Sequence, residues 1–275
     1  MGPAVCLDEG HANFHTLEGR FRTFGELLRL DGYVVNASRA AFSAEALARC
    51  TILVISNAQP GSDDWNSYPY PTPSAFTDDE IASVQRWVRD GGALLLIADH
   101  MPLAGAAQKL AAAFEVTFSD GFAVERHTSE AEREAAFAKP TLFQLDTQTL
   151  RPHAIVRGRA PNESITRVRT FTGQAFQAPA AAQPLLVLPP GFISLMPEKP
   201  WQFGPETKRI PVDGWLQGAV MPFGSGRAAF FGEAAMFTAQ VSGPEQKPMG
   251  MNAPMAEQNP QFVLNLMHWL SGILK

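Results

Sequence analysis

The sequence has little of several features that mark particular classes of protein. Its 275 residues include only two cysteines, Cys6 and Cys50, too few for a disulfide framework in a chain of this size. Basic side chains do not predominate either, since 22 Lys and Arg stand against 27 Asp and Glu and the formal net charge is -5. Because nucleic acids are bound through a positive field, we expect no nucleic-acid partner.

A long apolar run is also missing. The longest, ALLLIA at Ala93 to Ala98, falls far short of the roughly 20 residues that a helix needs to cross a bilayer, so we expect no membrane partner. No basic and then apolar leader precedes the first predicted strand, although a leader removed beforehand would leave the same sequence. We therefore expect a soluble protein of the cytoplasm or the periplasm, and its oligomeric state stays open.

The two cysteines are expected to be buried structural thiols. Cys6 lies inside an apolar strand pattern, and Cys50 stands just before another. A free cysteine in such a setting behaves as a small apolar side chain.

The chain carries enough apolar material for one large core, because 45% of its residues are hydrophobic and only 18% are charged. Short apolar segments that end in polar residues alternate with segments of helical spacing, which predicts a single α/β domain over residues 1–275. We expect a doubly wound, mostly parallel sheet with helices on both faces. The predicted strands are Ala4 to Leu7, Tyr33 to Val35, Thr51 to Ser56, Ala93 to Ala98 and Arg227 to Phe231, and the predicted helices are Phe21 to Leu30, Ser43 to Arg49, the segment behind the capping box Thr77 to Glu80, Ala104 to Phe114 and Asn259 to Leu270.

The segment from about 115 to 215 lacks this rhythm. Prolines are scattered through it, and it holds β-like stretches at Ala154 to Val156, Ile165 to Thr170 and Leu185 to Leu188. We expect a β-rich insertion or an extension of the sheet there.

Several predicted strands end in polar residues that can carry chemistry. These residues are Asp8 and Glu9, Asn57, Asp99 and His100, and Glu233. In an open parallel sheet the carboxyl ends of the strands share one edge, and ligands bind in the crevice outside it. The polar residues are therefore predicted to share one pocket, which His11 and His15 of the first loop would join.

Neutral imidazoles together with carboxylates are a common ligand set for divalent ions. We predict that a divalent metal ion, with zinc favoured, is held by His11, His15, His100 and Asp8. The spacing of the first two histidines differs from the zinc-protease pattern, because Ala12 stands where that pattern has Glu. An alternative of similar weight is that these two histidines only brace the first loop.

The predicted function is a metal-dependent hydrolase of a small-molecule ester, phosphoester or amide. A bound metal ion would acidify a water molecule and polarise the substrate. Glu233 or Glu9 is the predicted general base, and Asn57 and Asn252 are predicted to donate hydrogen bonds to the developing oxyanion. The sequence contains neither the Gly-x-Ser-x-Gly elbow of serine hydrolases nor a Walker phosphate loop, which disfavours those two classes.

Two alternatives use the same residues differently. In a metal-free hydrolase, Asp99 is the nucleophile and His100 or His11 is its base. In a non-catalytic module, the pocket binds a sugar or a peptide against an aromatic loop that contains Trp65, Tyr68, Tyr70 and Phe76. A purely structural role as helix caps also stays open for Asp99 and Glu233.

Six stretches of the sequence resemble a known family. They are DEGHANFHTLEGRF (8–21), LLRLDGYVV (27–35), GGALLLIADHMPLAGAA (91–107), FTGQAF (171–176), GEAAMFTAQ (232–240) and MGMNAPMAEQNPQF (249–262). Through them the chain resembles the flavodoxin-like superfamily of class I glutamine amidotransferase domains, and more closely a bacterial branch related to the intraflagellar-transport GIFT domains and the ThuA-like domains. The resemblance implies the doubly wound fold over the whole domain but no activity. Where the amidotransferases carry a cysteine after a central strand, this sequence has Asp99, so hydrolysis of glutamine through a thiolate is not implied.

Overall fold

The apolar segments that alternate with polar turns form the central sheet of the protein. The computed structural model describes residues 2–61, 64 and 67–275. The parallel strands lie in the order β2-β1-β3-β4-β14, and their bounds are β1 (Ala4–Asp8), β2 (Val34–Ser38), β3 (Ile52–Ser56), β4 (Ala93–Ile97) and β14 (Gly226–Phe231). This is the strand order of a flavodoxin-like sheet, so the predicted fold class is confirmed.

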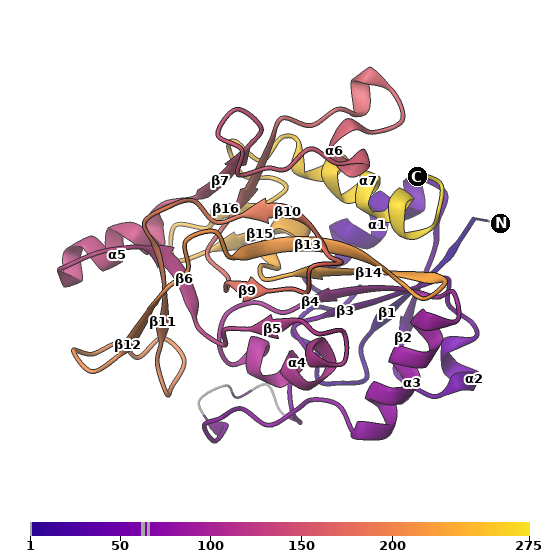
Figure 1. Ribbon diagram of the computed structural model, residues 1–275, viewed down its shortest axis with the longest axis horizontal. Coiled ribbons are helices and arrows are strands. Elements are labelled where there is room, and N and C mark those ends of the chain that lie inside the picture. The colour runs from indigo at the N-terminus through magenta and orange to yellow at the C-terminus, as the bar shows by residue number, and fades with distance from the viewer. Residues whose placement is uncertain (1, 62–63, 65–66) are drawn as a thin grey trace.

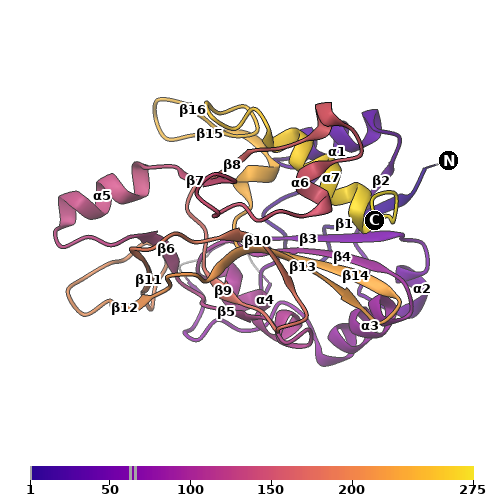
Figure 2. The same ribbon diagram turned by 45° about the horizontal axis from the view of Figure 1, so that its top comes forward.

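Both faces of the sheet are buried because helices cover each of them (Figure 1, Figure 2). One face carries α1 (Arg22–Leu30) and α7 (Asn259–Leu270), and the other carries α2 (Ala44–Leu47), α3 (Asp78–Arg89) and α4 (Leu103–Ala112). On β4, Leu95 packs in the core beneath α1 and α7, whereas Leu94 and Leu96 pack in the core beneath the other helices. This two-sided burial explains why β4 is apolar at every position rather than at every second one.

Two helices begin at the caps that the sequence predicts. Thr77 accepts a hydrogen bond from the Glu80 N–H and the Glu80 side chain accepts one from the Thr77 N–H, which completes the capping box of α3. Ser43 accepts a hydrogen bond from the Ala46 N–H at the start of α2. In the described part of the chain, none of the helices combines the length and the apolar content that a bilayer crossing needs.

The region between α4 and β13 (Leu216–Phe223) is rich in strands, as predicted. β5 (Thr117–Phe118), β9 (Phe176–Gln177) and β10 (Gln183–Val187) extend the main sheet through the antiparallel strand β13. A separate three-stranded sheet of β6 (Phe122–Glu125), β11 (Phe192–Met196) and β12 (Lys208–Pro211) extends from the body of the molecule together with α5 (Glu130–Ala138) (Figure 1). Two hairpin-like pairs complete the fold: β7 (Thr141–Gln144) with β8 (Arg167–Thr170), and β15 (Ala239–Ser242) with β16 (Lys247–Gly250).

The strand predicted at Ala154 to Val156 is wrong, because these residues form the helix α6 (Ala154–Arg157). The His153 imidazole accepts a hydrogen bond from the Ile155 N–H and caps the helix, and Gly158 ends it with a φ of 67°. Histidine is not a usual cap residue, so the sequence carried no clear helix signal. The protein also has two short 3₁₀ turns, η2 (Pro161–Glu163) and η3 (Ala235–Phe237).

The prediction of two free thiols is also wrong, because Cys6 and Cys50 form a disulfide. Cys6 lies in β1 opposite Leu53 of the neighbouring strand β3, and Cys50 stands just before that strand. The pairing of the two strands brings the Cα atoms of the cysteines within 5.7 Å, although 44 positions separate them in the sequence. The contact depends on the order of the strands in the sheet, which sequence spacing does not reveal.

Removal of the disulfide by the double substitution C6A/C50A is expected to lower the free energy of unfolding by about 2 to 4 kcal/mol, because the crosslink restricts the unfolded chain. Urea denaturation of the wild type and of the double variant, each with and without dithiothreitol, measures the effect. Reductant should lower the midpoint of the wild type and leave the double variant unchanged. Equal midpoints in all samples would contradict the prediction.

Candidate functional site

A pocket of about 250 Å³ opens at the carboxyl edge of the parallel sheet. Loops that follow β1, β3, β4 and β14 contribute to it, together with the hairpin β15–β16 and parts of the β-rich region. Its lining consists of Phe14, His15, Arg20, Asn57, Asp99, His100, Leu103, Phe171, Thr172, Trp201, Glu233, Ala235, Gln240, Val241, Ser242 and Met249. Of the residues predicted to share one site, the structure therefore brings together His15, Asn57, Asp99, His100 and Glu233.

Two carboxyl groups emerge next to each other because β4 and β14 are parallel neighbours. Ile97 pairs with Phe231, so Asp99 and Glu233 follow at the same level of the sheet edge. Glu233 is 1% exposed, and its two oxygens accept hydrogen bonds of 2.8 Å from backbone N–H groups of the turn η3. Burial and the negative charge of Asp99 outweigh these bonds and raise the pKa of Glu233 well above its usual value. Glu233 thus caps a helical turn and also lines the pocket.

Asn57 connects the end of β3 with Asp99. Its backbone is left-handed, with a φ of 49°, a conformation that asparagine tolerates better than most residues, and the residue is 1% exposed. The Oδ1 atom of Asn57 accepts a hydrogen bond of 2.9 Å from the Asp99 N–H. The Nδ2 group is therefore the part of this side chain that can donate to a ligand in the pocket.

His15 is an uncharged imidazole in the pocket wall. Its Nδ1 shares a hydrogen bond of 2.8 Å with the Ser56 hydroxyl, and its ring stacks on Phe21. Burial, together with the positive charge of Arg20, lowers the pKa of His15 to about 3. The side chain is consequently suited to hydrogen bonding and not to taking up a proton near neutral pH.

His100 is held in one orientation by its neighbours. Its Nδ1 lies 2.8 Å from the Met101 carbonyl oxygen, and because that oxygen can only accept, Nδ1 carries a hydrogen. The ring stacks on Phe122 with a centroid distance of 4.3 Å, and the Trp201 ring meets it edge-on at 4.7 Å.

A second polar cluster in the first loop is not part of the pocket lining. The Nδ1 of His11 is 2.9 Å from Asp8, and its Nε2 is 2.9 Å from Glu80. Burial disfavours the imidazolium, but the two carboxylates prevail and raise the pKa of His11. Burial also acts against the charge of Glu80, yet hydrogen bonds from Thr77, His11 and Phe42 lower its pKa to about 2. This geometry supports the alternative in which His11 braces the first loop, here against α3.

Asp8, His11 and Glu9 are therefore not brought into the pocket as predicted. Successive side chains at a strand end point to opposite sides, and Asp8 is directed to the His11 cluster. Glu9 accepts a hydrogen bond from the Leu17 N–H and forms an ion pair of 2.7 Å with Arg39.

The residues predicted to bind zinc do not fit a metal ion in this arrangement. Both ring nitrogens of His11 face carboxylates, and His11 and Asp8 lie outside the pocket lining that contains His15 and His100. Over residues 2–61, 64 and 67–275, no group of three or more His, Cys, Asp or Glu side chains is arranged to hold a metal ion.

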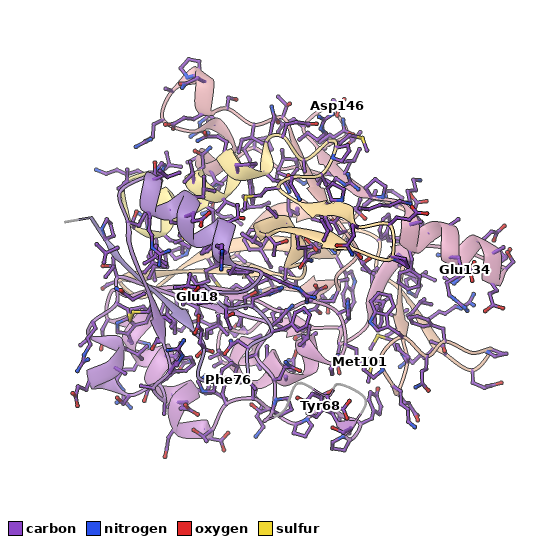
Figure 3. All side chains as sticks on the ribbon, turned by 180° about the vertical axis from the view of Figure 1, so that it is seen from behind. Glu18, Tyr68, Phe76, Met101, Glu134 and Asp146 are labelled. Carbon is purple, nitrogen blue, oxygen red and sulfur yellow. A yellow bond between two sulfur atoms is a disulfide. The ribbon has the colours of Figure 1, made fainter. Side chains whose placement is uncertain are left out.

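Tyr68 and Asn252, two of the residues predicted to contact substrate, do not line the pocket either. Trp65 lies outside the described residues. The Tyr68 hydroxyl donates to the Gln59 side chain at 3.3 Å, and Figure 3 shows Tyr68 near the edge of the molecule. Asn252 is exposed, and its side chain donates to the Gln240 carbonyl oxygen at 3.2 Å.

Other aromatic residues form the pocket wall, namely Phe14, Phe171 and Trp201. Trp201 is 48% exposed and has a φ of 63°, and Thr172 has a φ of 147°. Such backbone conformations are costly for residues with large or branched side chains and are found most often at functional sites. Phe171 and Thr172 belong to the FTGQAF stretch, which the resemblance had marked, whereas no signal in the sequence distinguished Trp201.

Neither protein-family models nor curated proteins gave a match to this sequence. Solved structures match over nearly the whole chain. The N-terminal domain of mmIFT52 is 12% identical, with 97% of each chain covered and a TM-score of 0.64. A cytoplasmic protein from Salmonella typhimurium is 14% identical over 98% of this chain and 99% of its own, with a TM-score of 0.54. A ThuA-like protein from Bacteroides uniformis is 11% identical over 97% and 90%, with a TM-score of 0.52. At these identities the likeness shows the fold alone, and it agrees with the doubly wound fold that the resemblance implied.

The charge on His11 is expected to stabilise the folded protein over a limited pH range. Because folding raises the pKa of His11 above 6.5, its contribution is complete below pH 6.5 and is lost as the pH rises through the folded value. Because folding lowers the pKa of Glu80 from 4.5 to about 2, its contribution is present above pH 4.5 and is lost as the pH falls towards 2. Urea denaturation should therefore show the largest stability difference between wild type and H11Q from about pH 4.5 to 6.5.

The variant H153Q is the control for this measurement. Burial lowers the pKa of His153, so the stability difference between wild type and H153Q should grow with pH instead of shrinking. An H11Q difference that stays constant from about pH 5.5 to pH 9 would show that folding does not raise the pKa of His11, and one that grows with pH would show that folding lowers it.

Proposed function

We propose that the protein is a hydrolase of a small, uncharged ester or amide and that Asp99 and Glu233 are its acid–base pair. The observation that carries the proposal is the adjacency of these two carboxyl groups at neighbouring strand ends in the pocket. Two carboxyl groups whose surroundings separate their pKa values can serve as acid and base in one reaction. The raised pKa of the buried Glu233 favours it as the acid.

In the proposed reaction, Asp99 takes a proton from a water molecule while that water attacks the carbonyl carbon of the substrate. Glu233 starts protonated and gives its proton to the leaving oxygen or nitrogen as the bond to carbon breaks. The products are a carboxylic acid and an alcohol or amine, and return of the proton from Asp99 to Glu233 restores the pair. In this proposal the Nδ2 group of Asn57 donates to the oxyanion that develops on the carbonyl oxygen, which is supported by the position of Asn57 in the pocket lining and by the engagement of its Oδ1 with the Asp99 N–H.

This proposal corresponds to the metal-free alternative, with Asp99 as a base for water instead of a direct nucleophile. The metal-dependent version is not developed further because two of its predicted ligands, Asp8 and His11, are paired with each other outside the pocket lining. A phosphoester is less favoured than an ester or amide, since Arg20 is the only described lining residue with a permanent positive charge and Asp99 would repel a phosphate.

We also propose that the chain belongs to the bacterial branch related to the GIFT and ThuA-like domains, and that it acts in the periplasm. The matches to the mmIFT52 domain and to a ThuA-like protein support the first proposal through the shared fold. The Cys6–Cys50 disulfide supports the second, because disulfides persist in oxidising compartments and are rare in the cytosol.

The substitutions D99N and E233Q are each expected to lower kcat by at least about 100-fold, because each removes one partner of the proton transfer. The assay is hydrolysis of a panel of chromogenic esters and anilides, with circular dichroism to confirm folding. D213N is the matched control, since the Asp213 carboxylate also accepts a backbone N–H but lies outside the pocket lining. Full activity of either pocket variant on a substrate that the wild type hydrolyses would refute the proposed pair.

The aromatic wall favours a second candidate, a module that binds a neutral sugar without chemistry. Phe171 and Trp201 offer apolar ring faces beside hydrogen-bonding groups, the combination on which sugar rings are commonly bound. Asp99 and Asn57 would then hold hydroxyl groups of the sugar.

If the pocket binds a sugar, W201A is expected to weaken binding roughly tenfold, because it removes one ring face from the wall. Calorimetric titration with a panel of mono- and disaccharides measures the affinity. Y70A is the control, since Tyr70 is a 49% exposed aromatic residue outside the pocket lining. Equal affinities of wild type and W201A would exclude Trp201 as a contact for the sugar. Turnover of any substrate by the wild type would favour the hydrolase over the binding module.

A further inference from the structure

Gln174 of the β-rich region forms hydrogen bonds with the main sheet at the residues that precede Asp99 and Glu233. The backbone N–H of Gln174 donates to the Gly232 carbonyl oxygen at 2.7 Å, and its side-chain Nε2 donates to the Ala98 carbonyl oxygen at 3.1 Å. Ala98 precedes Asp99, and Gly232 precedes Glu233. A single side chain and its own backbone therefore connect the ends of β4 and β14 at the last residue before each acid.

The hydrogen-bonding groups of Gln174 are engaged, and the residue is fully buried. Its Oε1 accepts a hydrogen bond from the Ser119 N–H at 2.9 Å, and its carbonyl oxygen accepts one from the Gln217 side chain at 3.3 Å. Gln217 lies on β13, and its side chain also donates to the Thr172 carbonyl oxygen at 2.7 Å. Its backbone carbonyl oxygen accepts a hydrogen bond from the Gly232 N–H at 2.9 Å. The result is a network of buried amides between the main sheet and the segment 172–174, and such a network resists displacement of any one member.

The packing around this network leaves no room for adjustment. Gly173 has a φ of 74°, and a Cβ atom at this position would lie 2.2 Å from the Gly232 carbonyl oxygen and 2.8 Å from the Cβ of Glu233. The segment thus lies in direct contact with the backbone that carries Glu233, and only glycine fits there.

We propose that Gln174 is a positioning residue that holds the ends of β4 and β14 together and thereby sets the spacing between Asp99 and Glu233. The ladder bond from the Ala98 N–H to the Phe231 carbonyl oxygen is the last one between the two strands before the acids. Beyond that bond, the carbonyl oxygens of Ala98 and Gly232 both accept hydrogen bonds from Gln174, the first from its side chain and the second from its backbone. Loss of the side-chain amide would leave the Ala98 carbonyl oxygen without its buried donor while the backbone bond to Gly232 stays, so the end of β4 would move away from that of β14 or admit water. The proposal rests on the proposed function only in treating the two acids as the reacting pair.

The test replaces Gln174 by the isosteric but apolar methionine and follows the Glu233 carboxyl in the free protein. The pKa is measured by ¹³C NMR of the side-chain carboxyl carbons, with the Glu233 signal identified by its loss in E233Q. The charged groups that act on Glu233, Asp99 and Arg169, are unchanged in Q174M. We expect the pKa of Glu233 to fall by about one unit or more, because separation from Asp99 and entry of water both favour the charged form.

The matched control is N265L. Asn265 is also fully buried, and its Nδ2 donates to the carbonyl oxygens of Ile155 and Glu163, away from the pocket. This variant should lose stability but keep the pKa of Glu233. An unchanged pKa in Q174M, or an equal fall in N265L, overturns the positioning role. If Q174M does not fold, Q217M takes its place, with a fall of the same sign expected and an unchanged value again counting against the proposal.

This readout separates the positioning role from the proposed function. The pKa of Glu233 is measured without substrate, so a fall in Q174M supports the role of Gln174 even if D99N and E233Q retain turnover. Loss of turnover in those two variants, together with an unchanged pKa of Glu233 in Q174M, would support the hydrolase proposal and refute the positioning role of Gln174.

Discussion

The parallel pairing of β4 with β14 is the constraint on which the pocket depends. Its register places Ile97 opposite Phe231, and from there the chain delivers Asp99 and Glu233 to one level of the sheet edge. Two acids in such proximity cannot both be ionised at low cost, and the one that is more deeply buried retains its proton to higher pH. The chemistry that we propose is a consequence of this adjacency and not of any unusual side chain.

The β-rich region adds a wall to that edge. It contributes Phe171, Thr172 and Trp201 to the wall and Gln174 to the backbone behind the acids. The parallel strands alone would leave the acids at an open rim, where water would screen their interaction. Residues held in strained backbone conformations, Thr172 and Trp201, lie where this region meets the pocket.

The histidines show how the partners of a side chain decide its role. The pKa of His11 is raised because carboxylates lie at both of its nitrogens, whereas the pKa of His15 is lowered because this residue is buried and lies near Arg20. The two residues lie four positions apart in one loop, yet Asp8 and Glu80 hold the first outside the pocket, and the second lines it. A shared residue type and a short spacing were therefore a poor guide to a common ligand set.

The sequence by itself determined the strands of the parallel sheet, most of the helices that cover it, and the edge at which Asp99 and Glu233 would lie. Hydrophobic periodicity and helix caps reflect which side chains are buried nearby. The apolar run ALLLIA, the capping box at Thr77 and the polar residues after each strand were therefore sufficient for these assignments. Only the tertiary structure decided which rim residues share a pocket, that Cys6 meets Cys50, and that Trp201 and Gln174 take part. These contacts join segments far apart in the chain, and they depend on strand order, register and the direction of each side chain at a strand end. Local pattern does not encode those three quantities, because the free energy that sets them comes from packing between the segments and not from within any one of them.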